Sequence, residues 1–320
     1  MTEREPSNMT SEQNPNSFTL SLPVMNEHAY AYSAKAEEQF PHEVYNDLLI
    51  VLRLPTCDES RKETFLIRRL LRMIYGSNMI SEIRAPFKTV RDICLPVFYQ
   101  DGTRVPPPDA TIDELLTFRH AEASIWMLAE MRRGEGLTEE MILKAHGMMT
   151  IGIQANDGFG THSSKYSGKY RQYDMHPDEC LVPAADIPGR MKRMIADYYR
   201  EISLASQHGG LDCIAHASWC CQSFMRIHPF SDGNGRMARL IINAVIFKYL
   251  NFVLPFGENA KSKNEFRDIS DALNESTDTN HFLKISSFIL RQVFKAAQED
   301  RGVWGFEEVK KEEEVEVQME

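Results

Sequence analysis

Residues 228–239 read His-Pro-Phe-Ser-Asp-Gly-Asn-Gly-Arg-Met-Ala-Arg, and no other stretch of the chain carries as much chemistry. His228 is the kind of side chain best able to accept a proton near neutral pH. Asp232 follows four positions later and offers the carboxylate oxygens that Mg²⁺ prefers alongside phosphate. The stretch therefore combines a candidate general base with a candidate metal ligand.

The second half of the stretch is typical of a site for phosphate groups. Gly233 and Gly235 let the backbone approach a ligand closely, so that successive N–H groups can point at phosphate oxygens. Arg236 and Arg239 are three positions apart, so on a helix both guanidinium groups leave the same side. Guanidinium forks match phosphate oxygens, and a helix that begins here adds its positive end. These features favour a nucleotide site.

The flanks place this stretch in a turn between two helices. Apolar residues recur with helical spacing over 211–225 and over 235–250. The same spacing predicts further helices over 42–54, 61–75, 111–133, 138–151, 187–202, 263–273 and 282–296. Only Gly168–Val182 lacks it, and that segment is predicted to form a short β-hairpin. The expected fold is all-α with one small hairpin.

The stretch resembles the signature of the Fic family, in which HPF is followed by any residue, Asp or Glu, GNGR, two free positions and Arg. Every fixed position of that signature is present, and the likeness covers roughly residues 110–298. The resemblance implies a compact helical Fic domain that acts as a protein adenylyltransferase. Such an enzyme transfers AMP from ATP to a protein hydroxyl (AMPylation), with ATP and Mg²⁺ required.

The resemblance also implies a role for each position. His228 would deprotonate a Ser, Thr or Tyr hydroxyl, which attacks the α-phosphorus of ATP while pyrophosphate leaves. Asp232 would hold Mg²⁺ between the α- and β-phosphates. Phe230 would fix the turn, and Phe266 would pack near the base. The residues expected to bind the nucleotide are Gly233, Asn234, Gly235, Arg236, Arg239 and Asn274.

The predicted hairpin has a counterpart in the family, a flap that holds the target polypeptide. Lys169-Tyr170-Arg171 resembles the start of that flap and Pro183 its end. Backbone pairing with an added strand would align a target hydroxyl, so a protein substrate is expected to dock at about 168–183. An ordinary surface hairpin is the alternative.

A segment before the catalytic domain resembles the family's inhibitory helix and departs from it at one position. Residues 76–84 read Gly-Ser-Asn-Met-Ile-Ser-Glu-Ile-Arg, and the likeness to the SN-x-IE form holds up to Ile80. Ser81 stands where the family has Glu, and Glu82 comes one position late, about 100° around a helix. Either Glu82 still reaches Arg239 and inhibits the enzyme, or the inhibition is weak and basal activity is high. A solvated Glu82 is the third interpretation.

Other functions stay open at this point. Residues 233–238 also fit the dinucleotide pattern G-x-G-x-x-A, although that pattern follows a β-strand and a helix is predicted here. Other Fic enzymes transfer a different group or remove AMP with the same signature. A non-catalytic ATP-binding regulator belongs to a different class, and it would have no need of a base such as His228. Cys213, His216 and Cys220 share one helix face, where they either hold a soft metal or simply pack.

Composition and charge limit the partners and the location. The chain has 320 residues, 42% of them hydrophobic, and a formal net charge of −10, which argues against nucleic acid or an anionic membrane as partner. The six cysteines form no CxxC pair, and residues 1–17 do not resemble a signal peptide. No apolar stretch approaches the roughly 20 residues of a membrane span. The expected location is the cytoplasm or nucleus.

The chain is expected to divide into four parts. These are a disordered N-terminus over 1–20, a helical regulatory segment over 21–108, the Fic catalytic domain over 109–298 and an acidic tail over 299–320. The proline run at 106–108 marks the boundary between regulator and catalytic domain. The exposed helix faces expected here are compatible with a homodimer.

Overall fold

A computed structural model describes residues 59–99, 105–134, 136–158, 160–175, 181–208, 210–275 and 280–303. Its elements, in chain order, are α2 (Glu59–Ile80), α3 (Phe87–Tyr99), α4 (Ile112–Arg133), α5 (Glu139–Thr150), α6 (Ser163–Tyr166), the 3₁₀ turn η2 (Ala184–Asp186), α7 (Ile187–His208), α8 (Cys213–Ile227), α9 (Asn234–Leu250), α10 (Ala260–Glu275) and α11 (Asn280–Val303). The described residues contain no β-strand, so the predicted all-α class is confirmed.

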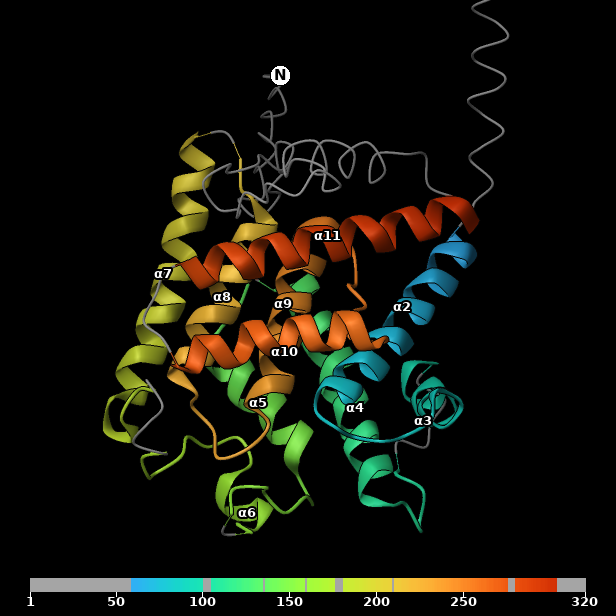
Figure 1. Cartoon of the computed structure of the whole chain (residues 1–320), viewed down its shortest axis with the longest axis horizontal. Helices are drawn as coiled ribbons and strands as arrows, with labels where there is room; N and C mark the ends of the chain where they lie inside the picture. Colours follow the sequence, from blue (N-terminus) through green and yellow to red (C-terminus); the bar gives the residue numbers. More distant parts are fainter. Residues whose placement is uncertain are drawn as a thin grey trace, which may run out of the picture.

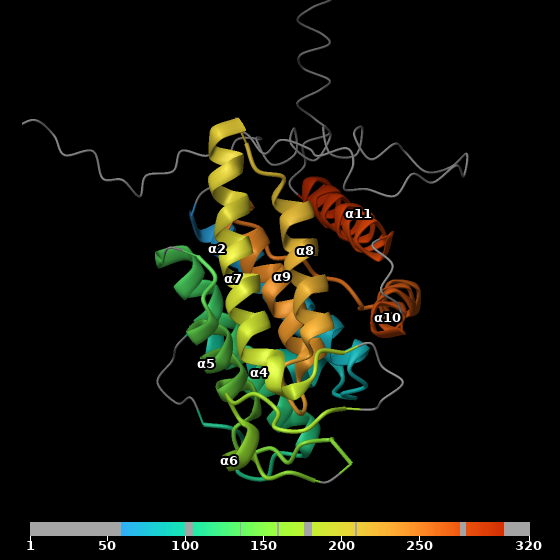
Figure 2. The same ribbon diagram turned by 90° about the vertical axis from the view of Figure 1, so that its left-hand side faces the viewer.

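Helix α9 is the centre of the fold. Almost every residue from Asn234 to Phe247 is buried, because α8 packs along one side of the helix and α4 along another. Helix α7 covers α8, and α5 lies against α4. Figures 1 and 2 show α10 and α11 side by side as a layer across one face of this bundle. The turn before α9 is thereby surrounded by packed helices.

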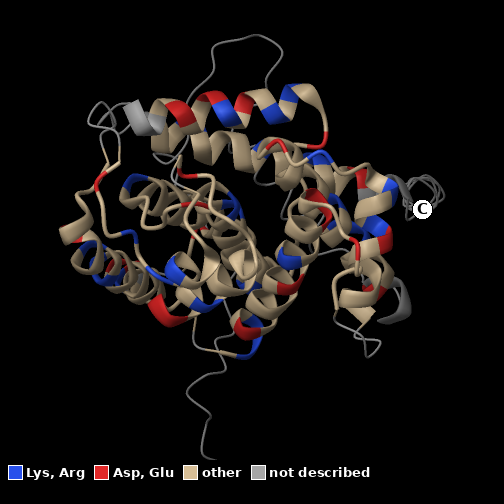
Figure 3. Cartoon of the chain, turned by 90° about the horizontal axis from the view of Figure 1, so that it is seen from below, with Lys and Arg blue, Asp and Glu red and all other residues tan. Residues whose placement is uncertain are grey.

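The surface carries both signs of charge. Figure 3 shows Lys and Arg interspersed with Asp and Glu along the outer helices seen from below. In the described part of the chain, no helix is both long enough and apolar enough to cross a membrane.

The helix starts follow the capping residues that the sequence indicates. Thr111 caps α4 in a reciprocal capping box with Glu114, and the Thr138 side chain accepts a hydrogen bond from the backbone N–H of Met141 at the start of α5. The predicted helices over 111–133 and 138–151 therefore agree closely with α4 and α5. Helix α11 continues to Val303, into the segment expected to be an acidic tail. The helix predicted over 42–54 lies outside the described residues.

Three local predictions differ from the structure. Residues 87–99 form helix α3, which the periodicity did not indicate, and Pro96 lies within it. The predicted hairpin is wrong for the described residues 168–175 and 181–182, which form turns; residues 176–180 lie outside the description. The physical reason is that the backbone N–H groups of Arg171 and Val182 donate to the carbonyls of Pro229 and Arg226, and not to carbonyls on the opposite arm of the predicted hairpin.

The third difference concerns the helix predicted over 61–75, whose end placed Gly76 just outside it as a helix terminator. Helix α2 instead runs through it to Ile80. A Cβ at position 76 would lie 2.0 Å from the carbonyl oxygen of Phe256, so this glycine allows two backbones to touch. It is a packing glycine inside a helix and not a helix terminator.

We expect Gly76→Ala to lower the free energy of unfolding by about 1–3 kcal/mol, because the added methyl group must push two backbones apart. Gly189→Ala, also in a helix but with nothing within 4 Å of its Cβ position, is the control. It should change stability by at most about 1 kcal/mol, in the stabilising direction. Denaturant unfolding measures both, and equal effects would contradict the close backbone contact.

Candidate active site

The turn between α8 and α9 is held in a conformation that few residues adopt. His228 ends α8 with left-handed backbone angles (φ 47°, ψ 59°), and its N–H donates to the carbonyl of Phe224 at 2.9 Å. Gly233, which precedes α9, also has a positive φ of 82°. Residues other than glycine rarely have left-handed backbone angles, so the groups around His228 must hold it in this conformation.

Asn234 closes this turn from within. Its side-chain oxygen accepts from the backbone N–H of Phe230 at 3.0 Å, and its amide nitrogen donates to the Phe230 carbonyl at 2.7 Å. The side chain is buried and fully engaged in these bonds. Of the groups expected to bind phosphate, Asn234 therefore offers its backbone and not its side chain.

His146 supports the turn from helix α5, and no sequence pattern pointed to it. Its ring stacks on that of Phe230, with centroids 3.6 Å apart and planes 3° from parallel. Nδ1 accepts from the N–H of Gly168 at 3.0 Å, so Nε2 carries the proton and donates to the Asp232 carbonyl at 2.9 Å. Burial lowers the pKa of His146 to about 4, so the ring is neutral near pH 7.

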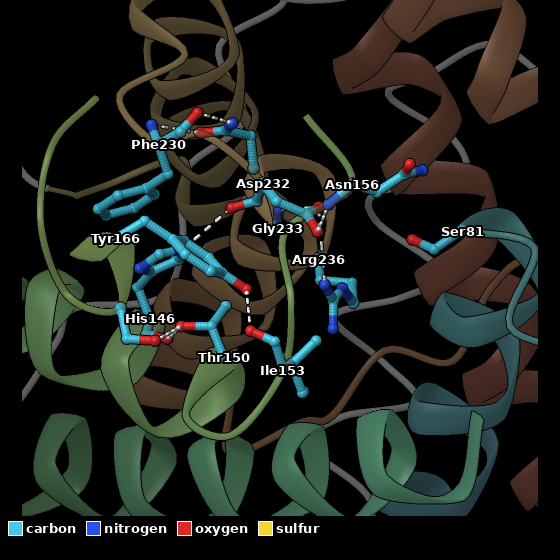
Figure 4. A network of polar contacts seen from close by, with 12 residues as sticks. Ser81, His146, Thr150, Ile153, Asn156, Tyr166, Phe230, Asp232, Gly233 and Arg236 are labelled. Carbon is cyan, nitrogen blue, oxygen red and sulfur yellow. Dashed lines mark hydrogen bonds and ion pairs between the residues drawn. The ribbon is translucent and has the colours of Figure 1, made fainter. Parts of the chain in front are cut away.

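Asp232 faces the space in front of the turn. Its Oδ1 accepts from the N–H of Gly233 at 2.5 Å, and its Oδ2 accepts from the N–H of Asn156 at 3.0 Å. The Arg236 guanidinium lies 3.9 Å from Oδ1. Figure 4 shows Asp232, Gly233 and Asn156 meeting at one point beside Arg236. Each oxygen keeps a lone pair for a further ligand.

Arg236 and Arg239 are both buried on α9, with 5% and 4% of their surface exposed. Nη1 of Arg236 is buried with no hydrogen-bond partner. Burial lowers the pKa of both groups, and that of Arg239 falls to about 9 with Arg236 as a second cause. In the described residues, the carboxylate of Asp232 is the one acidic group within 4.0 Å of either guanidinium. The site therefore has an excess of buried positive charge, which favours an anion.

The end of helix α2 covers Arg239 with neutral oxygens. Nε of Arg239 donates to the Ser77 hydroxyl at 2.8 Å, and Nη2 donates to the Ser77 carbonyl at 3.0 Å and to the Ser81 hydroxyl at 2.5 Å. Asn78, next along, donates to Thr117 and lies 3.2 Å from Nδ1 of the buried His120. Polar residues of α2 thus anchor this segment against α4 and α9.

Glu82 lies away from this contact. It has a positive φ of 61°, and its Oε1 accepts from Arg267 of α10 at 2.9 Å. Both side chains are exposed, and the hydrogen bond from Arg267 lowers the pKa of Glu82. The arrangement in which Glu82 reaches Arg239 is therefore not the one in this structure; Ser81 holds that position.

His228 is half-buried and neutral near pH 7. Burial lowers the pKa of its imidazole to about 4, and the charge of Arg171 lowers it further, while the Met225 carbonyl and Asp232 act in the opposite direction. A neutral imidazole can accept a proton. The structure brings His228, Asp232 and both arginines to one turn, as their spacing implies.

The residues expected near the base are less closely tied to the site. Phe266 is buried in the core, with its ring 5.0 Å from that of Phe256 and 5.6 Å from that of Phe288. Asn274 lies in the last turn of α10, and its side chain is outside the description. The assignment of Asn274 stays a prediction.

Cys213, His216 and Cys220 all lie in the core. The ring of His216 packs between Tyr198 and Trp219, with centroids 4.7 and 6.2 Å away. Among the described residues, no group of three or more His, Cys, Asp or Glu is placed to hold a metal ion.

Comparison with known proteins identifies the family. Residues 136–246 match the Fic/DOC family. A Fido domain-containing protein from Dictyostelium discoideum is 30% identical over 124 residues, which span 37% of this chain and 82% of that protein. The chain therefore belongs to the Fic/DOC family.

Solved structures share the fold at lower identity. Fic-1 from C. elegans has a TM-score of 0.61 at 17% identity, covering 83% of this chain and 72% of that one. A Fic domain-containing signaling protein from Bacteroides thetaiotaomicron has a TM-score of 0.58 at 18% identity, covering 81% of this chain and 94% of that one. The shared fold thus extends beyond residues 136–246.

The buried histidines predict how stability depends on pH. Burial lowers the pKa of both His146 and His216 to about 4. Since the unfolded chain binds protons more readily, each contributes stability that is complete above about pH 6.5 and is lost as the pH falls toward 4. The loss should reach about 1 kcal/mol per pH unit for each.

His216→Phe removes one of these groups while keeping a ring between Tyr198 and Trp219. Its free energy of unfolding should therefore fall less steeply between pH 6.5 and 4 than that of the wild type. Denaturant unfolding at several pH values measures this, and identical slopes would show that His216 does not stay neutral in the folded protein.

Proposed function

We propose that this protein transfers AMP from ATP to a hydroxyl side chain of a target protein, with release of pyrophosphate. One observation carries the proposal: the imidazole of His228 ends the turn that leads to two buried guanidinium groups, and among the described residues only Arg236 has a carboxylate, that of Asp232, within 4.0 Å. Membership of the Fic/DOC family supports a transferase in general. The turn has the groups that such a transfer needs, a base for the hydroxyl and positive charge for the phosphates.

His228 would act as the general base. Its imidazole takes the proton of the target hydroxyl, and the freed oxygen forms a bond to the α-phosphorus. The bond from that phosphorus to the bridging oxygen of the β-phosphate breaks, so AMP stays on the target and pyrophosphate leaves. Arg236 and Arg239 would bind the departing phosphates. The negative charge of the phosphates would offset the buried positive charge of the two guanidinium groups.

The residues present fit a magnesium ion shared with the nucleotide. Mg²⁺ is usually held by one or two carboxylates together with substrate phosphates, and Asp232 is such a carboxylate. The lack of a larger acidic cluster among the described residues agrees with this mode and not with an all-protein cage. When bound, the ion would supply positive charge to the phosphates.

The protein substrate would reach His228 along residues 168–175 and 181–183. Two backbone hydrogen bonds connect this loop to the catalytic turn and the end of α8. The N–H of Arg171 donates to the carbonyl of Pro229, and the N–H of Val182 donates to the carbonyl of Arg226. A target segment that passes along the loop would present its hydroxyl to the imidazole. A homodimer and a cytoplasmic or nuclear location remain predictions from the sequence.

The test is incubation of the protein with ATP labelled at the α-phosphate, in parallel with ATP labelled at the γ-phosphate. Label from the α position should appear on protein, and His228→Ala should slow its transfer by about 10²- to 10⁴-fold. His162→Ala removes an exposed imidazole outside the turn and is the control. Label from the γ position alone would indicate kinase-like chemistry, and no label with intact ATP binding would indicate a non-catalytic regulator.

The contacts of Arg239 predict how the activity is regulated. Glu82→Ala should leave the transfer rate within about twofold, because Glu82 pairs with exposed Arg267 and such pairs contribute little. Ser81→Glu should lower the rate about tenfold or more, since it brings a carboxylate to the guanidinium that the nucleotide needs. Ser81→Ala is the control and should keep full activity. A large rise in rate for Glu82→Ala would instead show that Glu82 inhibits the enzyme.

A further inference from the structure

Arg171 joins the substrate-side loop to the catalytic turn through a side chain with no exposed surface. Its Nε donates to the carbonyl of His228 at 2.8 Å, and its Nη1 donates to that of Tyr173 at 2.8 Å. Its Nη2 donates to the carbonyl of Val182. The backbone N–H of Arg171 donates to the carbonyl of Pro229 at 2.9 Å. One residue therefore binds two parts of the loop and two consecutive carbonyls of the turn.

These two carbonyls control where the imidazole points. His228 has left-handed backbone angles, which cost a residue with a Cβ about 1–2 kcal/mol and persist only when neighbouring groups fix them. The carbonyl of His228 belongs to the peptide that follows this left-handed residue. Two hydrogen bonds from Arg171 hold that peptide and the next one, so they fix the direction in which the His228 side chain leaves the backbone.

The cost of burying Arg171 indicates that its position is specific. A guanidinium without water is costly unless it is hydrogen-bonded, and here each of its three nitrogens donates to a backbone carbonyl, from three segments in all. The Asp174 carboxylate lies 3.9 Å from Nη1, but it is 72% exposed and accepts from the N–H of Ala184 at 2.6 Å. The positive charge also lowers the pKa of His228, which keeps the imidazole ready to accept a proton.

We propose that Arg171 is a positioning residue for the transfer reaction. It fixes the described parts of the loop, 171–175 and 181–183, relative to the imidazole of His228. A hydroxyl that a target presents along the loop then lies within reach of the base. The inference rests on the proposed function, and it assigns Arg171 no contact with the nucleotide. Lysine cannot replace it, because one ammonium group cannot bridge carbonyls spread over three segments.

The experiment compares Arg171→Met and Arg171→Lys with the wild type in the full chain. Both variants should lower kcat for the transfer of α-labelled AMP, Arg171→Met by about 10- to 100-fold, because small misplacements of reacting groups slow reactions on this scale. The KM for ATP and the Kd of a non-hydrolysable ATP analogue should stay within about twofold. Arg69→Met, which removes a guanidinium packed over Phe252 away from the turn, is the matched control and should keep kcat.

Three results would overturn the positioning role of Arg171. A kcat above half the wild-type value in folded Arg171→Met protein overturns the proposal, as does an equal loss in Arg69→Met. A parallel loss of analogue binding would also overturn it, because Arg171 would then act on the nucleotide site. If Arg171→Met does not fold, Arg171→Lys carries the test, with its melting temperature measured beside kcat.

A further measurement separates this inference from the proposed function. If the wild type shows no transfer that depends on His228, the proposed function fails. The positioning role of Arg171 is then tested by measurements that do not need catalysis. Amide hydrogen exchange at residues 171–174, 182 and 226–230 should be faster in Arg171→Lys than in the wild type. NMR titration should show a higher His228 pKa in Arg171→Met, since a neighbouring positive charge is gone. Unchanged exchange and titration would overturn the positioning role itself.

Discussion

Burying Arg236 and Arg239 on the central helix removes two charges from water, and in the described structure only Asp232 stands close enough to offset either of them. A buried charge without a partner is costly, so the surrounding structure is built to supply oxygen atoms. Carbonyl and hydroxyl groups at the end of α2 serve Arg239. Nη1 of Arg236 has no hydrogen-bond partner, so this guanidinium keeps an unmet need for an acceptor.

The same constraint explains the character of the contact between α2 and α9. Ser77 and Ser81 accept hydrogen bonds from Nε and Nη2 of Arg239 without neutralising its charge. A carboxylate at that place would do both, and it would then compete directly with phosphate. The carboxylate of Glu82, a residue with left-handed backbone angles, is instead paired with Arg267. The guanidinium is thus kept ordered while it stays electrostatically available.

Local sequence patterns predicted the helices and the catalytic turn well, because both depend on short-range physics. Apolar spacing and threonine caps mark α4 and α5, and the spacing of His228, Asp232 and the two arginines brings them to one turn. What escaped prediction depends on partners far along the chain. Gly76 looked like a helix terminator, since nothing nearby reveals the backbone of Phe256 against it.

The residues that support the catalytic turn were not predicted from the sequence, for the same reason. His146 stands in an apolar helix face, and its stacking on Phe230 joins residues that are distant in sequence. Arg171 lay in a segment that lacks helical spacing, which was interpreted as a hairpin. Its backbone bonds to the turn took the place of strand pairing. Sequence alone therefore indicated which groups would do chemistry, but not which ones hold them in place.

The contact at Gly76 has a mechanical consequence for the surroundings of Arg239. Helix α2 meets the chain that leaves α9 backbone to backbone at Phe256, so it has no room to slide or roll as a rigid rod. Ser81 lies beyond this anchor, in an exposed turn. Of the oxygens that accept from Arg239, the Ser81 hydroxyl is therefore the one outside helix α2, while the two of Ser77 belong to the segment that the contact at Gly76 holds in place. The surroundings of this guanidinium thus depend on where α2 stops, and the backbone contact fixes that point.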